Sequence, residues 1–199
     1  AADLKIKSII LGYDEDTRKL AKNFSYQDEM DFLVRHPKRN KFLRNLALST
    51  DNNTLILFQY VEKHGRMLYN MMRDKDPDRP IYFIYGGIDA DQREEVRHLV
   101  EKNNNAIIVA SYGTFSTGVN IRNLHNVIFS SPTKSRVRTL QSIGRGLRIA
   151  DLKTKVTVYD IADDLKYKTH VNFTLLHFME RLNIYNSENY EYKIFNANI

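Results

Sequence analysis

Two arginines three residues apart, Arg145 and Arg148, lie in the segment Gln141–Arg148 and are suited to contact a phosphoryl group. Guanidinium groups stay charged and present a planar fork of donors that matches phosphate oxygens. Gly144 and Gly146 let the backbone come close to another surface. An arginine that reaches a transferring phosphoryl group from outside its binding loop can raise the rate by roughly 10³–10⁵. The residues alone are equally compatible with two surface arginines in ordinary ion pairs.

Two further segments have the composition of anion-binding loops. Ser111–Ile121 concentrates hydroxyls and glycines after an apolar run, where backbone N–H groups can face an anion. Gly86 and Gly87 precede a helix that we expect Asp89 to cap, in a capping-box pattern with Gln92. Each segment alone is also compatible with an ordinary turn.

The alternation of short apolar runs with helical patterns predicts an α/β fold with a mostly parallel sheet covered by helices on both faces. Ligands of such sheets bind beyond the carboxyl ends of the strands. The segments expected to carry chemistry therefore directly follow the predicted strands. The predicted strands are 5–11, 54–58, 81–84, 106–110, 126–130, 155–161 and 190–195, and the segments that follow five of them are 59–60, 85–87, 111–120, 131–138 and 162–164.

Helices are expected at 28–34, 41–48, 61–73, 89–100, 135–143 and 169–182. Val61, Leu68, Met71 and Met72 are candidate core positions of the helix at 61–73. Val96, Leu99 and Val100 share one face of the helix at 89–100. We expect residues 1–50 to be an entry segment, 51–164 the central lobe, and 165–199 a helical extension with a tail.

Positive charge is clustered, which suggests a polyanionic partner. Residues 131–155 hold seven basic residues and one acidic residue, and residues 35–44 hold five basic residues and no acidic one. A solvated surface is the alternative explanation for either cluster.

Several classes of protein are excluded or disfavoured. The chain has no cysteine, which excludes a disulfide scaffold and fits a cytoplasmic location. It has no apolar run of the roughly 18 residues that a membrane span requires. It also contains no Gly-x-x-x-x-Gly-Lys-[Ser/Thr] loop, so the arginines would have to act on a nucleotide held elsewhere. The histidines show no metal-ligand spacing, and we expect no metal site.

Four segments together resemble superfamily 2 helicases in order and spacing. Gln141–Arg148 resembles motif VI (Gln-x-x-Gly-Arg-x-x-Arg), and Ser111–Ile121 resembles motif V. Leu55–His64 resembles motif IV, and Tyr85–Arg93 resembles the adjoining nucleic-acid-contact motif. Residues 80–199 are more specifically similar to phage recombination helicases.

The resemblance implies a RecA-like lobe of the P-loop-NTPase type, packed against a first lobe that carries the Walker motifs. ATP would lie between the lobes, with Mg²⁺ held mainly by the first lobe. Arg145 and Arg148 would reach the γ-phosphate, Gln141 would orient them, and Gly118, Asn120 and Gly144 would lie near the nucleotide. The residues implied to contact a nucleic-acid strand are Gln59, Gly86, Gly87, Arg93, Ser111 and Thr114.

The phage relatives imply branched DNA and RNA–DNA hybrids as substrates, and the host cytoplasm as the location. Two departures weaken the transfer of roles, because many relatives have an acidic residue at Asn120 and an arginine at Ser142. Two other functions stay open from the residues: a non-catalytic nucleic-acid-binding module and a small-molecule enzyme with a nucleotide cofactor. The lack of a glycine-rich first turn disfavours the second of these.

Overall fold

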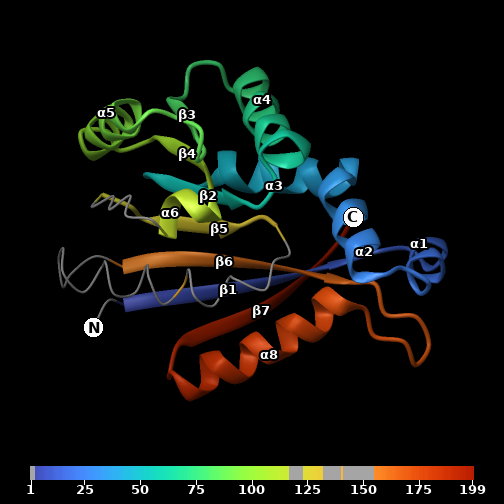
Figure 1. Ribbon diagram of the computed structural model, residues 1–199. Helices are drawn as coiled ribbons and strands as arrows, with labels where there is room; N and C mark the ends of the chain where they lie inside the picture. The colour runs from blue at the N-terminus through green and yellow to red at the C-terminus, as the bar shows by residue number, and fades with distance from the viewer. Residues whose placement is uncertain (1–2, 117–122, 132–139, 141–154) are drawn as a thin grey trace.

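The computed structural model describes residues 3–116, 123–131, 140 and 155–199. Its strands form one seven-stranded sheet in which every neighbouring pair is parallel, in the order β3-β4-β2-β5-β6-β1-β7 (Figure 1). The strands are β1 (Asp3–Gly12), β2 (Thr54–Phe58), β3 (Ile81–Ile84), β4 (Ile107–Ser111), β5 (Asn126–Phe129), β6 (Lys155–Asp164) and β7 (Glu191–Asn198). All seven predicted strands are confirmed, with ends shifted by up to three residues.

Helices cover both faces of this sheet, and their bounds are α1 (Glu15–Ala21), α2 (Tyr26–Arg35), α3 (Pro37–Ser49), α4 (Arg66–Lys75), α5 (Ala90–Glu101), α6 (Tyr112–Ser116) and α8 (Phe173–Ser187). One core cluster joins the sheet to residues of α1 to α4, such as Leu33, Leu43 and Leu68. A second cluster joins the other face to Val100 of α5 and Tyr185 of α8. The predicted α/β architecture with two covered faces is therefore confirmed.

The sheet runs through all three parts into which the sequence divides the chain. Strand β1, from the expected entry segment, pairs along its whole length with β6, from Asp3 opposite Lys155 to Gly12 opposite Asp164. Strand β7, from the expected tail, pairs with the other side of β1. Long-range pairing thus incorporates residues 3–12 and 191–198 into the same sheet as the central strands, although neither segment is adjacent to them in sequence.

Three local predictions differ from the structure. The helix expected from Val61 begins with a π-helical turn (Val61–Gly65) and becomes α-helical only at Arg66. Asp89 does cap α5, but its carboxylate accepts from the Asp91 N–H at 2.7 Å and not from Gln92. Leu99, which was expected to share one apolar face with Val100, is 42% exposed, whereas Val100 is fully buried. The predicted helix 135–143 lies, except for Leu140, outside the described residues.

Candidate nucleic-acid interface

Three of the segments that are predicted to contact nucleic acid follow adjacent β-strands, and they meet at the carboxyl edge of the sheet. Phe58 of β2 is paired with Ser111 of β4, and Ile84 of β3 is paired with Ala110. Strands β3, β4 and β2 lie side by side (Figure 1). Gln59 therefore follows the strand next to that of Ser111, and Gly86 and Gly87 follow the strand on the other side of β4. The side chain of Gln59 and both glycines are exposed, which leaves this edge accessible to a ligand.

The segment after β4 is not the open loop expected from sequence, because its first five residues, Tyr112–Ser116, form the short helix α6. The Ser111 hydroxyl precedes this helix and accepts a hydrogen bond from the Thr114 N–H at 3.4 Å. The two hydroxyl oxygens of Ser111 and Thr114 lie 2.6 Å apart. Thr114 is only 3% exposed, so Ser111 is the more accessible member of the pair.

The two glycines after β3 differ in the space around them. A Cβ added to Gly86 would have no heavy atom within 4 Å, whereas one added to Gly87 would lie 3.1 Å from the Tyr85 ring. Open space at Gly86 permits the close backbone approach that its predicted role requires. Arg93 lies in the first turn of α5 and is half-buried.

The predicted nucleotide-facing residues all lie outside the described residues: Gly118, Asn120, Gln141, Gly144, Arg145 and Arg148. Two described residues flank the stretch that leads to Gln141. Ser131, two residues after the end of β5, is fully buried, and Leu140, the residue before Gln141, is 1% exposed within the core.

Four groups from separate parts of the chain contact Ser130 and Ser131. The Arg39 Nη1 donates to the Ser130 carbonyl at 2.7 Å, and the Tyr112 hydroxyl donates to the Ser131 carbonyl at 3.3 Å. The Ser131 hydroxyl accepts from the Gln59 N–H at 3.0 Å and lies 3.0 Å from the His64 Nδ1. Sequence reasoning identified the segment after β5 but not these partners.

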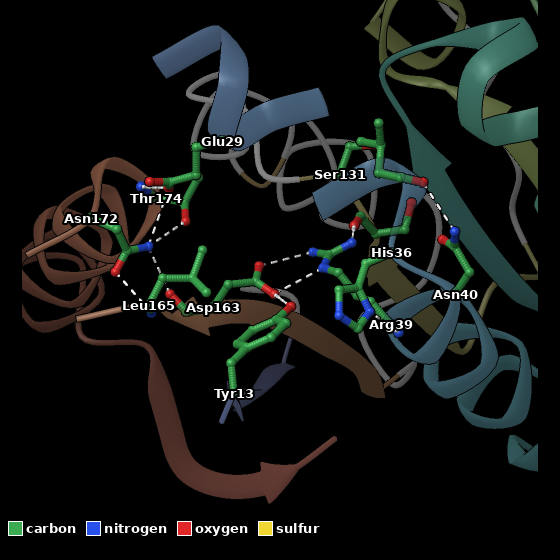
Figure 2. Close-up of polar contacts among 12 residues, drawn as sticks. Tyr13, Glu29, His36, Arg39, Asn40, Ser131, Asp163, Leu165, Asn172 and Thr174 are labelled. Atoms are coloured by element: carbon green, nitrogen blue, oxygen red, sulfur yellow. Dashed lines mark hydrogen bonds and ion pairs between the residues drawn. The ribbon is translucent and has the colours of Figure 1, made fainter. Parts of the chain in front are cut away.

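Arg39 is fully buried in an ion pair with Asp163, at the carboxyl end of β6 (Figure 2). Its guanidinium makes two hydrogen bonds to the carboxylate, at 2.9 and 3.1 Å, and the Tyr13 hydroxyl donates a third at 2.6 Å. Burial, together with the nearby Asp163 charge, holds the pKa of the Tyr13 hydroxyl well above its usual value, so it stays a donor. Within the basic run 35–44, Arg39 thus faces the interior and not a polyanion.

A second buried group joins α2 to α8. The Glu29 carboxylate is 1% exposed and accepts from the backbone N–H groups of Phe173 and Thr174, at 3.1 and 2.7 Å (Figure 2). It also accepts from the Asn172 side chain at 3.2 Å. An acidic group at a helix N-terminus satisfies donors that have no partner within the helix. Glu29 therefore fixes the start of α8 against the N-terminal part of the chain.

Two further classes of site were searched for in the part of the chain that the structure describes. It contains no group of three or more histidine, cysteine, aspartate or glutamate residues that could hold a metal ion. Nor do these residues include a helix of the length and apolarity that crossing a membrane requires.

Comparison with known proteins agrees with this architecture. The family described as the helicase conserved C-terminal domain matches residues 37–150. The chain is 36% identical to the ATP-dependent DNA helicase uvsW of Enterobacteria phage T4, over 99% of this chain and 41% of that protein. The crystal structure of T4 UvsW superposes with a TM-score of 0.87 at 34% identity, covering 98% of this chain and 42% of that one.

More distant structures share the fold alone. Domain 2 of the DEAD-box helicase Mss116p, bound to an RNA duplex, has a TM-score of 0.55 at 15% identity and covers 96% of this chain and 63% of that one. The Sulfolobus solfataricus SWI2/SNF2 ATPase core in complex with double-stranded DNA has a TM-score of 0.55 at 16% identity, covering 80% and 41%. The sheet and its helices thus match RecA-like C-terminal lobes of helicases, and the chain spans about two fifths of its curated relative.

Proposed function

Because the chain belongs to the family described as the helicase conserved C-terminal domain, we propose that it is the second motor lobe of an ATP-dependent DNA helicase or translocase. The observation that carries the proposal is that three segments expected to contact nucleic acid, those after β2, β3 and β4, meet at one edge of the sheet. Ser131, which precedes the arginine segment in the sequence, contacts the first of them at Gln59. The likeness to UvsW along almost the whole chain supports the same role.

The nucleotide contacts form one half of an ATP site. Arg145 and Arg148 would stabilise the charge that develops on the transferring phosphoryl group, and Gln141 would orient them. Gly118, Asn120 and Gly144 would line the nucleotide. Because the sequence has no Walker loop of its own, a first RecA-like lobe of the same polypeptide would hold ATP and most of the Mg²⁺ ligands.

The strand contacts would lie along the carboxyl edge of the sheet. Backbone and hydroxyl groups near Gln59, Gly86, Gly87, Arg93, Ser111 and Thr114 would bind the phosphates of one strand. Such contacts carry no sequence information, which suits an enzyme that moves along its track. The similarity to a phage DNA helicase supports DNA as the track. The substrates proposed for the intact polypeptide are branched DNA and RNA–DNA hybrids in recombination, repair or replication, within the host cytoplasm.

The chemistry would follow a cycle of lobe closure. Closure on ATP would bring the two arginines to the γ-phosphate, and hydrolysis with product release would reopen the cleft. Each closure would shift the strand contacts of this lobe relative to those of the first lobe, which moves the enzyme along the strand.

ATP turnover by residues 1–199 compared with that of the intact polypeptide tests the division of labour. The isolated chain is expected to hydrolyse no ATP above background, with or without DNA, whereas the intact polypeptide hydrolyses ATP faster when DNA is added. Robust turnover by the isolated chain would show that it holds a complete nucleotide site and is not half of one. DNA binding by an intact polypeptide without any ATPase activity would favour a non-catalytic nucleic-acid-binding module.

A further inference from the structure

Ser131, in the segment after β5, contacts two of the segments that are proposed to bind nucleic acid. Its Oγ lies 3.0 Å from the Gln59 backbone nitrogen, and Gln59 is a proposed strand contact. Its carbonyl accepts from Tyr112, which directly follows Ser111, a second proposed contact. In the sequence, Ser131 lies ten residues before Gln141. One residue therefore connects the segments after β2, β4 and β5.

The hydrogen bonds around His64 have a defined direction. The Asn40 side chain donates its Nδ2 to the Val34 carbonyl at 3.0 Å, which turns its Oδ1 toward the His64 Nε2, also at 3.0 Å. Because an amide oxygen only accepts, His64 carries its proton on Nε2. Its Nδ1 must then accept from the Ser131 hydroxyl, whose oxygen accepts in turn from the Gln59 N–H. Each hydrogen bond in this relay therefore has a single direction, which is set by the hydrogen bonds on either side of it.

The side chains of the relay are buried, so water cannot take the place of a removed side chain without a cost in free energy. His64 and Ser131 are 0% exposed and Asn40 is 1% exposed. Burial, and to a lesser degree the charge of Arg39, lowers the pKa of His64 to about 3. The ring is therefore neutral near neutral pH, and the donor directions do not change under ordinary conditions. A buried donor left without its partner is unfavourable, which couples the position of Gln59 to that of Ser131.

We propose that His64 and Ser131 are positioning residues that couple nucleic-acid contact at Gln59 to ATP hydrolysis, the step assigned above to the arginines that follow β5 in the sequence. This inference rests on the proposed motor function and deepens it. Binding of a strand fixes the Gln59 backbone, which fixes the Ser131 hydroxyl and with it the point at which the chain leaves β5. Neither residue touches ATP or the strand in this account. Their removal uncouples the two events without removing a ligand contact.

The test uses the intact polypeptide and a synthetic forked DNA. The readout is the ratio of kcat for ATP hydrolysis with saturating DNA to kcat without DNA. Ser131→Ala is expected to lower this ratio about tenfold, in the range of typical coupling between sites. Because both values of kcat are measured at saturating ATP, and the stimulated one at saturating DNA, weakened DNA binding does not contribute to the ratio.

The matched control is Thr50→Ala, which removes a hydroxyl that is 7% exposed at the amino end of β2. It is expected to leave the ratio unchanged. Ser131→Thr keeps the hydroxyl and is expected to retain most of the ratio. His64→Phe, which keeps an aromatic ring but removes both nitrogens, is expected to match Ser131→Ala, and the double variant is expected to show no additional loss.

Distinct outcomes overturn distinct claims. A wild-type ratio in folded Ser131→Ala, or an equal loss in Thr50→Ala, overturns the relay while the motor function stands. A wild-type polypeptide that DNA does not stimulate overturns the proposed function itself. Nitrogen-15 NMR of histidine-labelled wild-type polypeptide tests the relay without any substitution. It should show the Nε2–H tautomer of His64, and an Nδ1–H tautomer would overturn the relay whether or not the variants fold.

Discussion

Replacing Arg39 with alanine would leave the Asp163 carboxylate buried with no cationic partner. The Asp163 side chain is 1% exposed, and the substitution removes both of its guanidinium hydrogen bonds and the donor to the Ser130 carbonyl. Removing one partner of a buried pair typically costs about 3–5 kcal/mol of unfolding free energy. For a chain of this length, that corresponds to a fall of about 6–20 °C in Tm.

Urea unfolding, with the free energy extrapolated to water, is the appropriate assay, and the m-value checks that the compactness of both states is unchanged. The control is Arg66→Ala, which breaks an exposed pair with Glu62 on one helix, where the arginine side chain is 43% exposed. Such pairs contribute about 1 kcal/mol or less. A loss in Arg39→Ala no larger than in the control would refute the assignment of a stabilising role to this pair.

A double variant separates the charge from the packing. Arg39→Met with Asp163→Leu removes both charges, so no uncompensated carboxylate remains in the interior. Replacing both partners of a buried pair with apolar residues is often close to neutral. We expect the double variant to recover most of the loss. The remainder, about 1–3 kcal/mol, reflects the Ser130 carbonyl and the Tyr13 hydroxyl, which both lose their partner. A double variant no more stable than Arg39→Ala would show that the buried carboxylate is not the cause of the loss.

Two other predictions concern the turn that carries His64. Its pKa is about 6.5 when unfolded and about 3 when folded, so between pH 7 and 5 only the unfolded chain takes up this proton. Lowering the pH from 7 to 5 therefore reduces the unfolding free energy by roughly 2 kcal/mol through this group. Urea unfolding at both pH values should show a weaker pH dependence of the unfolding free energy in His64→Gln. The exposed control His98→Gln should keep the wild-type dependence. In the same turn, a Cβ on Gly65 would lie 2.6 Å from the Phe58 ring, so Gly65→Ala should lower the unfolding free energy by about 1–3 kcal/mol. Gly86→Ala, with open space around its Cβ, should change it little, and equal thermal melts for the two variants would contradict the packing argument.

The central strands were predictable because each is a short apolar run with clear ends. Thr54–Phe58 and Ile81–Ile84 match the predicted limits without a shift, and all five residues of β2 are buried. Their order in the sheet is not encoded locally. The position of β1 between β6 and β7 depends on pairing across 152 residues of chain to β6 (Asp3 with Lys155) and 186 residues to β7 (Lys5 with Glu191), which periodicity cannot reveal.

The candidate site was predictable where it follows strands and not where it depends on distant partners. Gln59, Gly86 and Ser111 could be located from strand ends alone. Arg39 belongs to a basic run that looks like a surface, because the partner that draws it inward, Asp163, is 124 residues away. Leu99 was misjudged for a related reason, since helical spacing gives the width of the apolar face but not where its margin lies.

The steady-state ATPase activity of an Arg148→Ala variant of the intact polypeptide tests the central claim most directly. Nucleotide affinity, measured separately by binding of a fluorescent ATP analogue, should stay close to wild type, because the first lobe holds most of the nucleotide. DNA-stimulated kcat should fall by roughly 10³-fold or more. Arg97→Ala, which removes an arginine paired with Glu94 and Glu101 on α5, serves as the control and should retain wild-type turnover. Unchanged turnover in Arg148→Ala would contradict the claim that this lobe completes the active site.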